Sequence, residues 1–451
     1  MTKVPMSSRK LADFSPGRTI LYAMFITIII GTCLLALPFA QTHAISLIDL
    51  FFTATSATCV TGAFTIPLSS FTLFGQIIIL ILIQIGGLGL VTMSLFLLSL
   101  FVNFGMATQL MAGQILEFES WPRIKNLIFF IIIATFGSEL IGTLLFFTVF
   151  RHDFATTDAV FLSLFHAVSS FCNAGIELFP GHLQKYSTNY IVLITSTFLM
   201  FFGGLGFITW REILRYFRAK INKKRYVFSL HSRIILNTSI ALLMASAIIF
   251  WILEQDNALR GLNGPLTIIS SIFYAVSMKS AGLLFLPVQS FQLATMFMIM
   301  VFGLIGSSPG STGSGIKIIT FAIIIATVKA AISSDISTNI KGRRIPADLV
   351  YKAFAIVAFS IGWIILTTFC LLITEKNPVF SDILFETISA FSTLGITTNT
   401  TSQLSSIGKL FIIASMIVGR VGSLTLILAL KIPRHGELEG IKYPEERIML
   451  G

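Results

Sequence analysis

The stretch Thr53-Ala-Thr-Ser-Ala-Thr-Cys-Val-Thr-Gly62 closes a short apolar segment with a glycine, and the chain repeats this ending three more times. The other endings are Cys172-Asn-Ala-Gly175, Lys279-Ser-Ala-Gly282 and Ser392-Thr-Leu-Gly395, so successive glycines are 113, 107 and 113 residues apart. Each ending lies in a gap between two apolar runs of membrane length. This spacing indicates internal duplication and predicts one structure assembled from four pseudo-equivalent quarters.

Composition indicates a membrane protein. Hydrophobic residues make up 55% of the chain and charged residues 11%, whereas a soluble domain has roughly 25% charged residues. With Leu293–Ala331 counted as one broken span, the apolar runs predict eight crossings of ~20 residues and an all-α polytopic membrane protein. The other runs are Ile20–Ala40, Ile77–Val102, Leu127–Phe150, Tyr190–Thr209, Ile234–Leu253, Phe354–Ile373 and Leu410–Leu430.

Basic residues predict the orientation. They gather in the N-terminal segment, the C-terminal tail and alternate loops, an asymmetry that puts both termini in the cytoplasm. The first apolar run has no small-residue cleavage site, so we expect it to be retained as a span. Attraction to anionic headgroups explains the net charge of +11 without a nucleic-acid partner.

A segment too short to cross precedes each glycine ending. Apolar stretches of ~10–14 residues are candidates for re-entrant helices, and three of these segments begin with Asp and one with Pro, residues that suit a helix start. Four such helices entering from outside would aim negative dipole ends at one axis and favour a cation there. The segments are Asp49–Thr58, Asp158–Phe171, Pro265–Met278 and Asp382–Phe391.

The residues that end these segments suit an ion filter. Rings of backbone carbonyls can replace the hydration shell of a potassium ion, and glycine adopts conformations closed to other residues. One glycine per quarter allows a shorter filter than in tetrameric channels and weaker discrimination against sodium. The alternative is four helix-ending glycines in ordinary loops. The predicted filter residues are Val60, Thr61, Gly62, Asn173, Ala174, Gly175, Ser280, Ala281, Gly282, Thr393, Leu394 and Gly395.

A second glycine signature follows each of the first. It begins 24, 28, 21 and 24 residues after its partner, and its simplest interpretation is close helix packing, in which small residues let backbones approach each other in lipid. The four signatures are Gly86-Gly-Leu-Gly89, Gly203-Gly-Leu-Gly206, Gly303-Leu-Ile-Gly306 and Gly419-Arg-Val-Gly422.

The third of these signatures opens the most unusual segment in the chain. Residues Gly303 to Lys317 contain five glycines and one proline in fifteen positions, and a helix there would cost ~1 kcal/mol per glycine and ~3 kcal/mol for the proline relative to alanine. We therefore expect a flexible loop that interrupts the membrane helix. A nucleotide cradle is the alternative, although the GxxxxGK[ST] pattern is absent.

Five polar residues fall inside apolar or filter segments. Arg420 must find a partner, because an unpaired charge is costly in a membrane. Glu139 and Glu386 either touch the ion route or hydrogen-bond behind it, and burial with a partner is expected for Glu139. His166 is expected to be packed rather than metal-bound, and Lys279 either tunes the filter or snorkels behind it.

The four endings, together with Gly419-Arg-Val-Gly-Ser-Leu-Thr425, resemble the Ktr/Trk/HKT superfamily of potassium transporters, most closely the KtrB-type membrane subunit of bacterial Ktr systems. The resemblance runs from about residue 18 to the end. It implies a homodimer in the bacterial inner (plasma) membrane, one pore per subunit, docked on a cytoplasmic ring of nucleotide-binding KtrA-like regulatory subunits. This chain itself shows no nucleotide-binding domain.

The resemblance also implies a gate. The loop Gly310–Gly315 would obstruct the pore below the filter, and Arg420 would oppose it. The chain departs from the family where Lys279 replaces the usual Arg and Leu283-Leu284 replaces Phe-Asn, which leaves selectivity at the third quarter open. The implied gating residues are Gly310, Ser311, Gly313, Gly315, Lys317 and Arg420.

We therefore predict a gated potassium-uptake subunit, with K⁺ as the transported ion and Na⁺ coupling left open. An intramembrane enzyme lacks support, because HExxH is absent and no paired-carboxylate arrangement is evident. An alternating-access carrier for an organic solute would normally show two-fold inverted repeats. The predicted divisions are a cytoplasmic segment 1–17, repeats at 18–104, 105–217, 218–333 (with the loop 303–317) and 334–430, and a cytoplasmic tail 431–451.

Overall fold

The computed structural model describes residues 16–89, 121–178, 182–335 and 337–422. The predicted N-terminal segment up to residue 15, the 104/105 repeat boundary and the predicted tail lie outside these ranges. The described helices are α1 (Pro16–Leu35), α2 (Leu47–Cys59), α3 (Leu73–Leu88), α6 (Trp121–Phe150), α7 (Thr156–Cys172), α8 (Tyr190–Gly204), α9 (Phe207–Ile221), α10 (Leu230–Glu254), α11 (Gly264–Ser280), α12 (Leu293–Leu304), α13 (Ile318–Ile332), α14 (Ala347–Thr374), α15 (Phe380–Ser392) and α16 (Ser406–Val421), with a small hairpin of β1 (Asn339–Ile340) and β2 (Arg343–Arg344).

The four predicted short segments are helices α2, α7, α11 and α15. Three of them begin two residues before the predicted Asp, which occupies the third helical position and stabilises the positive end of the helix dipole from there. Ser46 caps α2 through its side chain. Asn263 caps α11 in the same way, one residue before Gly264. The sequence therefore places the helix starts too late, because an Asp that favours the first turn of a helix need not be its N-cap residue.

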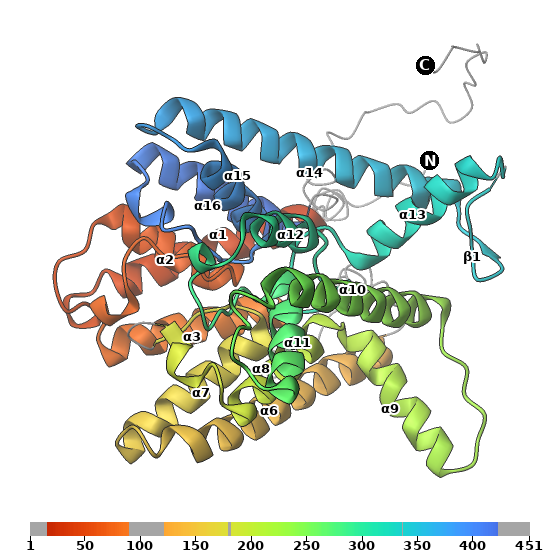
Figure 1. Ribbon diagram of the computed structural model, residues 1–451, viewed down its shortest axis with the longest axis horizontal. Coiled ribbons are helices and arrows are strands. Elements are labelled where there is room, and N and C mark those ends of the chain that lie inside the picture. The colour runs from red at the N-terminus through yellow and green to blue at the C-terminus, as the bar shows by residue number, and fades with distance from the viewer. Residues whose placement is uncertain (1–15, 90–120, 179–181, 336, 423–451) are drawn as a thin grey trace, which may run out of the picture.

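Helix packing follows a cyclic order. The helix after each short helix packs against the short helix of the next quarter: α3 against α7, α8 against α11, α12 against α15, and α16 against α2. Figure 1 shows the consequence, because the chain runs round the molecule and its last described helices, α15 and α16, return to lie beside α1 and α2. The four short helices and the four helices that follow them therefore alternate around a closed ring.

By length and composition, three helices in the described ranges can cross a membrane: α6 from Asn126, α10 and α14. The other apolar helices are shorter, so this criterion does not reach the predicted eight crossings. The predicted break in the third quarter is present between α12 and α13. Large apolar side chains such as Phe129, Ile133 and Leu140 are exposed along α6, and exposed apolar surface on this scale suits a lipid environment.

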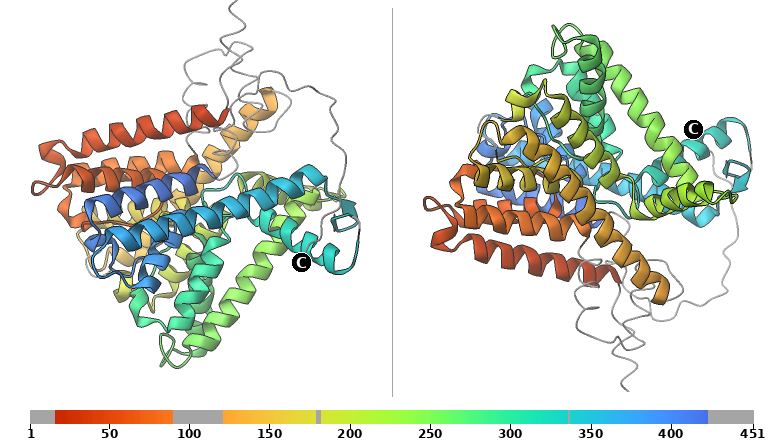
Figure 2. Two further views of the ribbon diagram at one scale, coloured as in Figure 1. Left: turned by 90° about the horizontal axis from the view of Figure 1, so that it is seen from above. Right: turned by 90° about the horizontal axis from the view of Figure 1, so that it is seen from below.

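One predicted span ends early. The apolar run Tyr190–Thr209 is predicted to be one crossing, but α8 ends at Gly204 and the chain bends by 105° into α9. Gly206, with φ of 88°, begins the new direction. Figure 2 shows α9 projecting away from the bundled helices. Hydrophobicity continues through the bend, so periodicity could not locate it.

Candidate ion site

Four short backbone turns follow the four short helices. We call them turn 1 (Val60–Gly62), turn 2 (Asn173–Gly175), turn 3 (Ser280–Gly282) and turn 4 (Thr393–Gly395). In turns 1, 2 and 4 the first residue has φ of 56°, 59° and 51°. In each of these three turns the next backbone N–H donates to the carbonyl five residues earlier at 2.8 Å. The three helices thus end with the same left-handed cap.

Turn 3 departs from this geometry. Its helix continues to Ser280, and the capping residue Ala281 keeps a right-handed conformation with φ of −114°. The N–H of Gly282 donates to the carbonyl of Ser277 at 2.9 Å. The third quarter, which also carries the sequence departures at Lys279 and Leu283-Leu284, is therefore different in its backbone too.

The four glycines close a ring. A β-carbon added to any of them would collide with the backbone carbonyl oxygen that precedes the glycine of the next turn, so each turn packs directly on its neighbour. All four glycines have positive φ, between 63° and 90°. The contacts are Gly62 on Ala174, Gly175 on Ala281, Gly282 on Leu394 and Gly395 on Thr61.

Serine side chains hold the turns to their helices. Ser169 donates to the carbonyl of Ile176 at 2.6 Å, and Ser389 donates to that of Ile396 at 2.7 Å. Ser56 accepts from the N–H of Gly62 at 3.1 Å, and in turn 3 Ser277 donates to the carbonyl of Leu283. Sequence reasoning missed these residues, although a serine six residues before the glycine recurs in three quarters.

A cavity opens on one side of the ring. Its volume is about 480 Å³, and all four turn glycines line it. The rest of its lining comes from residues that follow the glycines, so the cavity lies on the side away from the short helices. Besides the glycines, its lining residues are Phe64, Thr65, Ile66, Pro67, Leu68, Ser69, Glu177, Leu178, Leu284, Leu286, Pro287, Val288, Gln289, Ile396, Thr397, Asn399 and Ser402.

Two buried carboxylates bond to protein groups. Glu139 accepts from Gln84 at 3.0 Å, which confirms the expected buried partner. Glu386 accepts from Thr401 at 2.6 Å and from the N–H of Thr398 at 3.0 Å. It therefore fastens the segment after turn 4.

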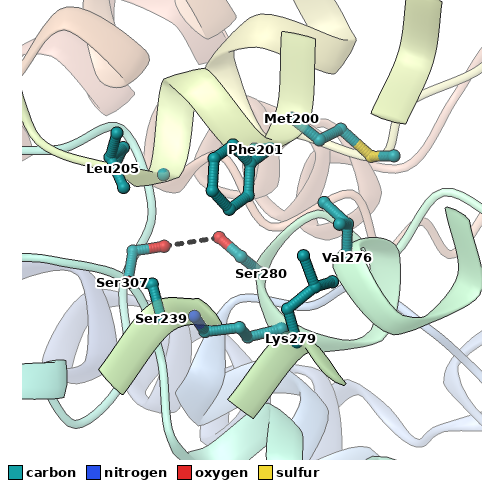
Figure 3. A pocket seen from close by; sticks show the side chains of 10 residues that line it. Met200, Phe201, Leu205, Ser239, Val276, Lys279, Ser280 and Ser307 are labelled. Carbon is teal, nitrogen blue, oxygen red and sulfur yellow. Dashed lines mark hydrogen bonds between the residues drawn. The ribbon is translucent and has the colours of Figure 1, made fainter. Parts of the chain in front are cut away.

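His166 lies on α7 and Lys279 on α11, two of the short helices. The ring of His166 meets Phe146 edge-on, and its Nε2 lies 3.3 Å from the hydroxyl of Ser196. Lys279 lines a pocket between α8, α10 and α11, where its amino group points toward Ser239 (Figure 3). Lys279 therefore lies in the last turn of α11, directly before turn 3.

The glycine-rich segment between α12 and α13 folds back on itself. Gly306 donates to the carbonyl of Ile316 at 2.9 Å, and Ser307 donates to that of Ser314 at 3.1 Å. Gly315 has φ of 77° and packs on the backbone of Gly306. We call residues 305–317 the intramembrane loop. Its backbone groups form hydrogen bonds across the loop instead of the bonds of a helix.

Residues of the predicted gate bond within this loop or line its surface. Lys317 donates to the carbonyl of Gly313 at 2.8 Å, and Ser311 donates to the carbonyl of Ser308 at 2.6 Å. Gly310 has φ of 66°, and a β-carbon there would meet nothing within 4 Å. A cavity of about 170 Å³ is lined by the loop together with Gly86, Gly89 and Arg420.

Arg420 bonds the intramembrane loop to the first quarter. One nitrogen donates to the carbonyl of Thr312 at 2.5 Å and to the hydroxyl of Ser314 at 3.1 Å. The other nitrogen donates to the carbonyl of Gly86. Arg420 therefore has the partners expected for a charge in an apolar segment, and the same bonds hold the loop.

In three quarters the second glycine signature packs as predicted. A β-carbon on Gly86, Gly203 or Gly419 would collide with a carbonyl near the end of the short helix of the same quarter, at Thr58, Phe171 and Phe391 respectively. Small residues at these positions are required for close backbone approach.

Comparisons with known proteins identify the family. Residues 13–437 match the model of the TrkH family, which is described as a cation transport protein. The chain belongs to the TrkH family. It is 34% identical to the Ktr system potassium uptake protein B of Bacillus subtilis, over 98% of both chains, and 33% identical to the potassium/sodium uptake protein NtpJ of Enterococcus hirae, over 99% of both.

A solved structure shares the fold. The potassium transporter TrkH from Vibrio parahaemolyticus matches with a TM-score of 0.72, covering 93% of this chain and 86% of that one at 16% identity. The recognised family and the helical fold are thereby confirmed. As a family member the protein is a membrane transporter rather than an enzyme in the usual sense.

Proposed function

We propose that this protein is the ion-translocating subunit of a potassium-uptake system and that K⁺ crosses through the ring of glycine turns. The observation that carries the proposal is the closed ring, in which each glycine packs on the carbonyl that precedes the next glycine. Four helix C-termini face this ring and contribute negative partial charge. Ring carbonyls can exchange for the hydration shell of K⁺.

The architecture belongs to the same proposal. We assign eight membrane crossings in four repeats with the predicted boundaries, of which α12 and α13 form one crossing interrupted by the intramembrane loop. The cyclic packing of α3, α8, α12 and α16 on successive short helices supports this assignment. The cavity lined by all four glycines is then the extracellular entrance.

The proposed setting follows from the relatives. The Bacillus subtilis relative, 34% identical to this chain, is named as part of a Ktr system. We propose that this chain forms a homodimer in the inner membrane, with both termini in the cytoplasm. The dimer would dock on a ring of KtrA-like regulatory subunits, and these subunits, rather than this chain, would bind the nucleotide. The Enterococcus hirae relative is named for both potassium and sodium. Na⁺ dependence is therefore part of the test.

The experiment uses a potassium-uptake-deficient bacterium that produces this protein with or without a Ktr regulatory subunit. Growth at low potassium and uptake of radioactive rubidium are measured, each with and without sodium. We expect rubidium uptake that rises with the partner. Verified membrane insertion without uptake in any combination would overturn the proposal.

A further inference from the structure

The residue two positions before the glycine is special in turns 2 and 3. It is Asn173 in turn 2 and Ser280 in turn 3, whereas Val60 and Thr393 occupy it in turns 1 and 4. The side chains of Asn173 and Ser280 both reach the intramembrane loop. Pseudo-equivalent positions in neighbouring quarters therefore make the same kind of contact.

In turn 2 the partner is Thr312. The Asn173 amide lies 2.7 Å from the Thr312 hydroxyl, and either orientation of the amide preserves this contact. The same hydroxyl lies 3.1 Å from the carbonyl of Phe171 at the end of α7. All of these groups are buried, and a buried hydroxyl that loses its partner incurs a desolvation cost.

In turn 3 the partner is Ser307. Its hydroxyl lies 2.6 Å from that of Ser280 (Figure 3). The pair is covered by Gly313, where an added β-carbon would collide with both hydroxyls. Glycine at position 313 therefore allows the loop to close on the serine pair.

The backbone of the loop is docked on the same side. Ser308 and Thr312 donate to the carbonyls of Gly204 and Gly203 at 3.1 Å each, and Phe207 donates to the carbonyl of Gly310 at 3.0 Å. The bend between α8 and α9 thus provides the seat for the loop. Moving the loop away from turns 2 and 3 would break these backbone bonds and, at the same time, the two side-chain contacts to the turns.

We propose that the contacts Asn173–Thr312 and Ser280–Ser307 form a latch that couples the intramembrane loop to turns 2 and 3, so that the loop cannot move without altering the filter. The proposal rests on the proposed function for its consequence in transport, but not for the contacts themselves. Residues 173 and 280 act here as positioning residues for the loop. Through these two contacts, movement of the loop would change the geometry of the ring that selects the ion.

The first test measures the loop without measuring transport. Ser311 lines the 170 Å³ cavity beside Arg420, so a Ser311→Cys variant reports loop exposure through its rate of maleimide labelling in membranes. Adding Thr312→Val, which deletes the latch hydroxyl at similar volume, should raise that rate roughly five-fold, the effect expected for one hydrogen bond of about 1 kcal/mol. Thr312→Ser should leave the rate unchanged. An unchanged rate in the Thr312→Val protein would overturn the latch.

The second test measures rubidium uptake without the regulatory subunit. Thr312→Val should increase uptake and reduce the preference for rubidium over sodium, whereas Thr27→Val, which deletes a hydroxyl bonded within α1 at 2.8 Å, should do neither. Faster labelling combined with no uptake even in the unmodified protein would contradict the proposed function and leave the latch standing. Increased uptake with unchanged ion preference would contradict the coupling.

A reversible lock tests the contact in turn 3. The hydroxyls of Ser280 and Ser307 are close enough that a double Ser280→Cys, Ser307→Cys variant should form a disulfide. Oxidation should stop rubidium uptake, and a reductant should restore it, whereas the single variants should not respond to the oxidant. Equal uptake by the verified disulfide and the reduced pair would contradict a latch that must open.

Discussion

Replacing Gly395 by Ala tests whether close packing within the glycine ring affects ion selection, apart from the backbone strain that any residue other than glycine has at a positive φ. Its φ is 72°, and a left-handed conformation costs an L-residue about 1–2 kcal/mol. The new β-carbon would also lie 2.7 Å from the carbonyl carbon and 2.8 Å from the α-carbon of Gly62, whereas carbon atoms in contact are separated by about 3.5–4.0 Å. Turns 1 and 4 must therefore move apart by roughly 1 Å.

Gly342 provides the matched control. It has φ of 74° in the turn between β1 and β2, and an added β-carbon would meet nothing within 4 Å. Gly342→Ala therefore carries the same conformational cost without the collision. Only Gly395→Ala should change ion selection.

The assay is competition between sodium and rubidium for uptake, normalised to the amount of folded protein in the membrane. A loss of about 1.4 kcal/mol in the difference between the two ions corresponds to tenfold, and we expect Gly395→Ala to lower the preference for rubidium by at least about that factor. Gly342→Ala should keep the original preference. Equal preferences in the two variants would refute the argument that the ring selects the ion.

Three further predictions follow from other contacts. Arg420→Ala should increase rubidium uptake without the regulatory subunit, because the two bonds to the intramembrane loop are lost. Arg420→Lys should have a smaller effect. If the Arg420→Ala protein fails to accumulate in the membrane and shows no faster uptake per folded molecule, the role of Arg420 is purely structural. Deleting residues 310–315 should likewise raise uptake, and a slower transporter would contradict a gate. Lys409→Met should lower the melting temperature in detergent by a few degrees, since Lys409 and Asp49 form a 2.7 Å ion pair with both side chains 14% exposed. Asp49 would lose its charged partner there, at a cost of about 1–3 kcal/mol, and would keep the hydroxyls of Ser46 and Thr65. Lys352→Met, at an exposed pair, should change the melting temperature little.

The ring was accessible to sequence reasoning because its elements are local. A short apolar segment followed by glycine at regular spacing predicts a short helix and a special turn in each quarter, and the helix ends lie close to their predicted positions. Which helix ends differently was not predictable. The extension of α11 to Ser280 depends on what packs around turn 3, and neighbouring residues alone do not encode that environment.

The long-range contacts were the least predictable. The bend between α8 and α9 lies inside an apolar run, where hydrophobicity continues. The glycines of Gly203-Gly-Leu-Gly206 permit the bend, but they do not show that it provides the seat for the intramembrane loop. The charge of Arg420 signalled a need for partners, but not which carbonyls would supply them. Asn173 and Thr312 are far apart in sequence, so their contact had no local signal.

The most direct test of the central claim is the position of the ion itself. Crystals of the protein grown in rubidium, with anomalous diffraction measured at the rubidium edge, would locate bound ions independently of transport. The account predicts a rubidium peak on the axis of the ring formed by Gly62, Gly175, Gly282 and Gly395. Well-ordered turns without a peak, together with rubidium bound elsewhere in the membrane region, would contradict it.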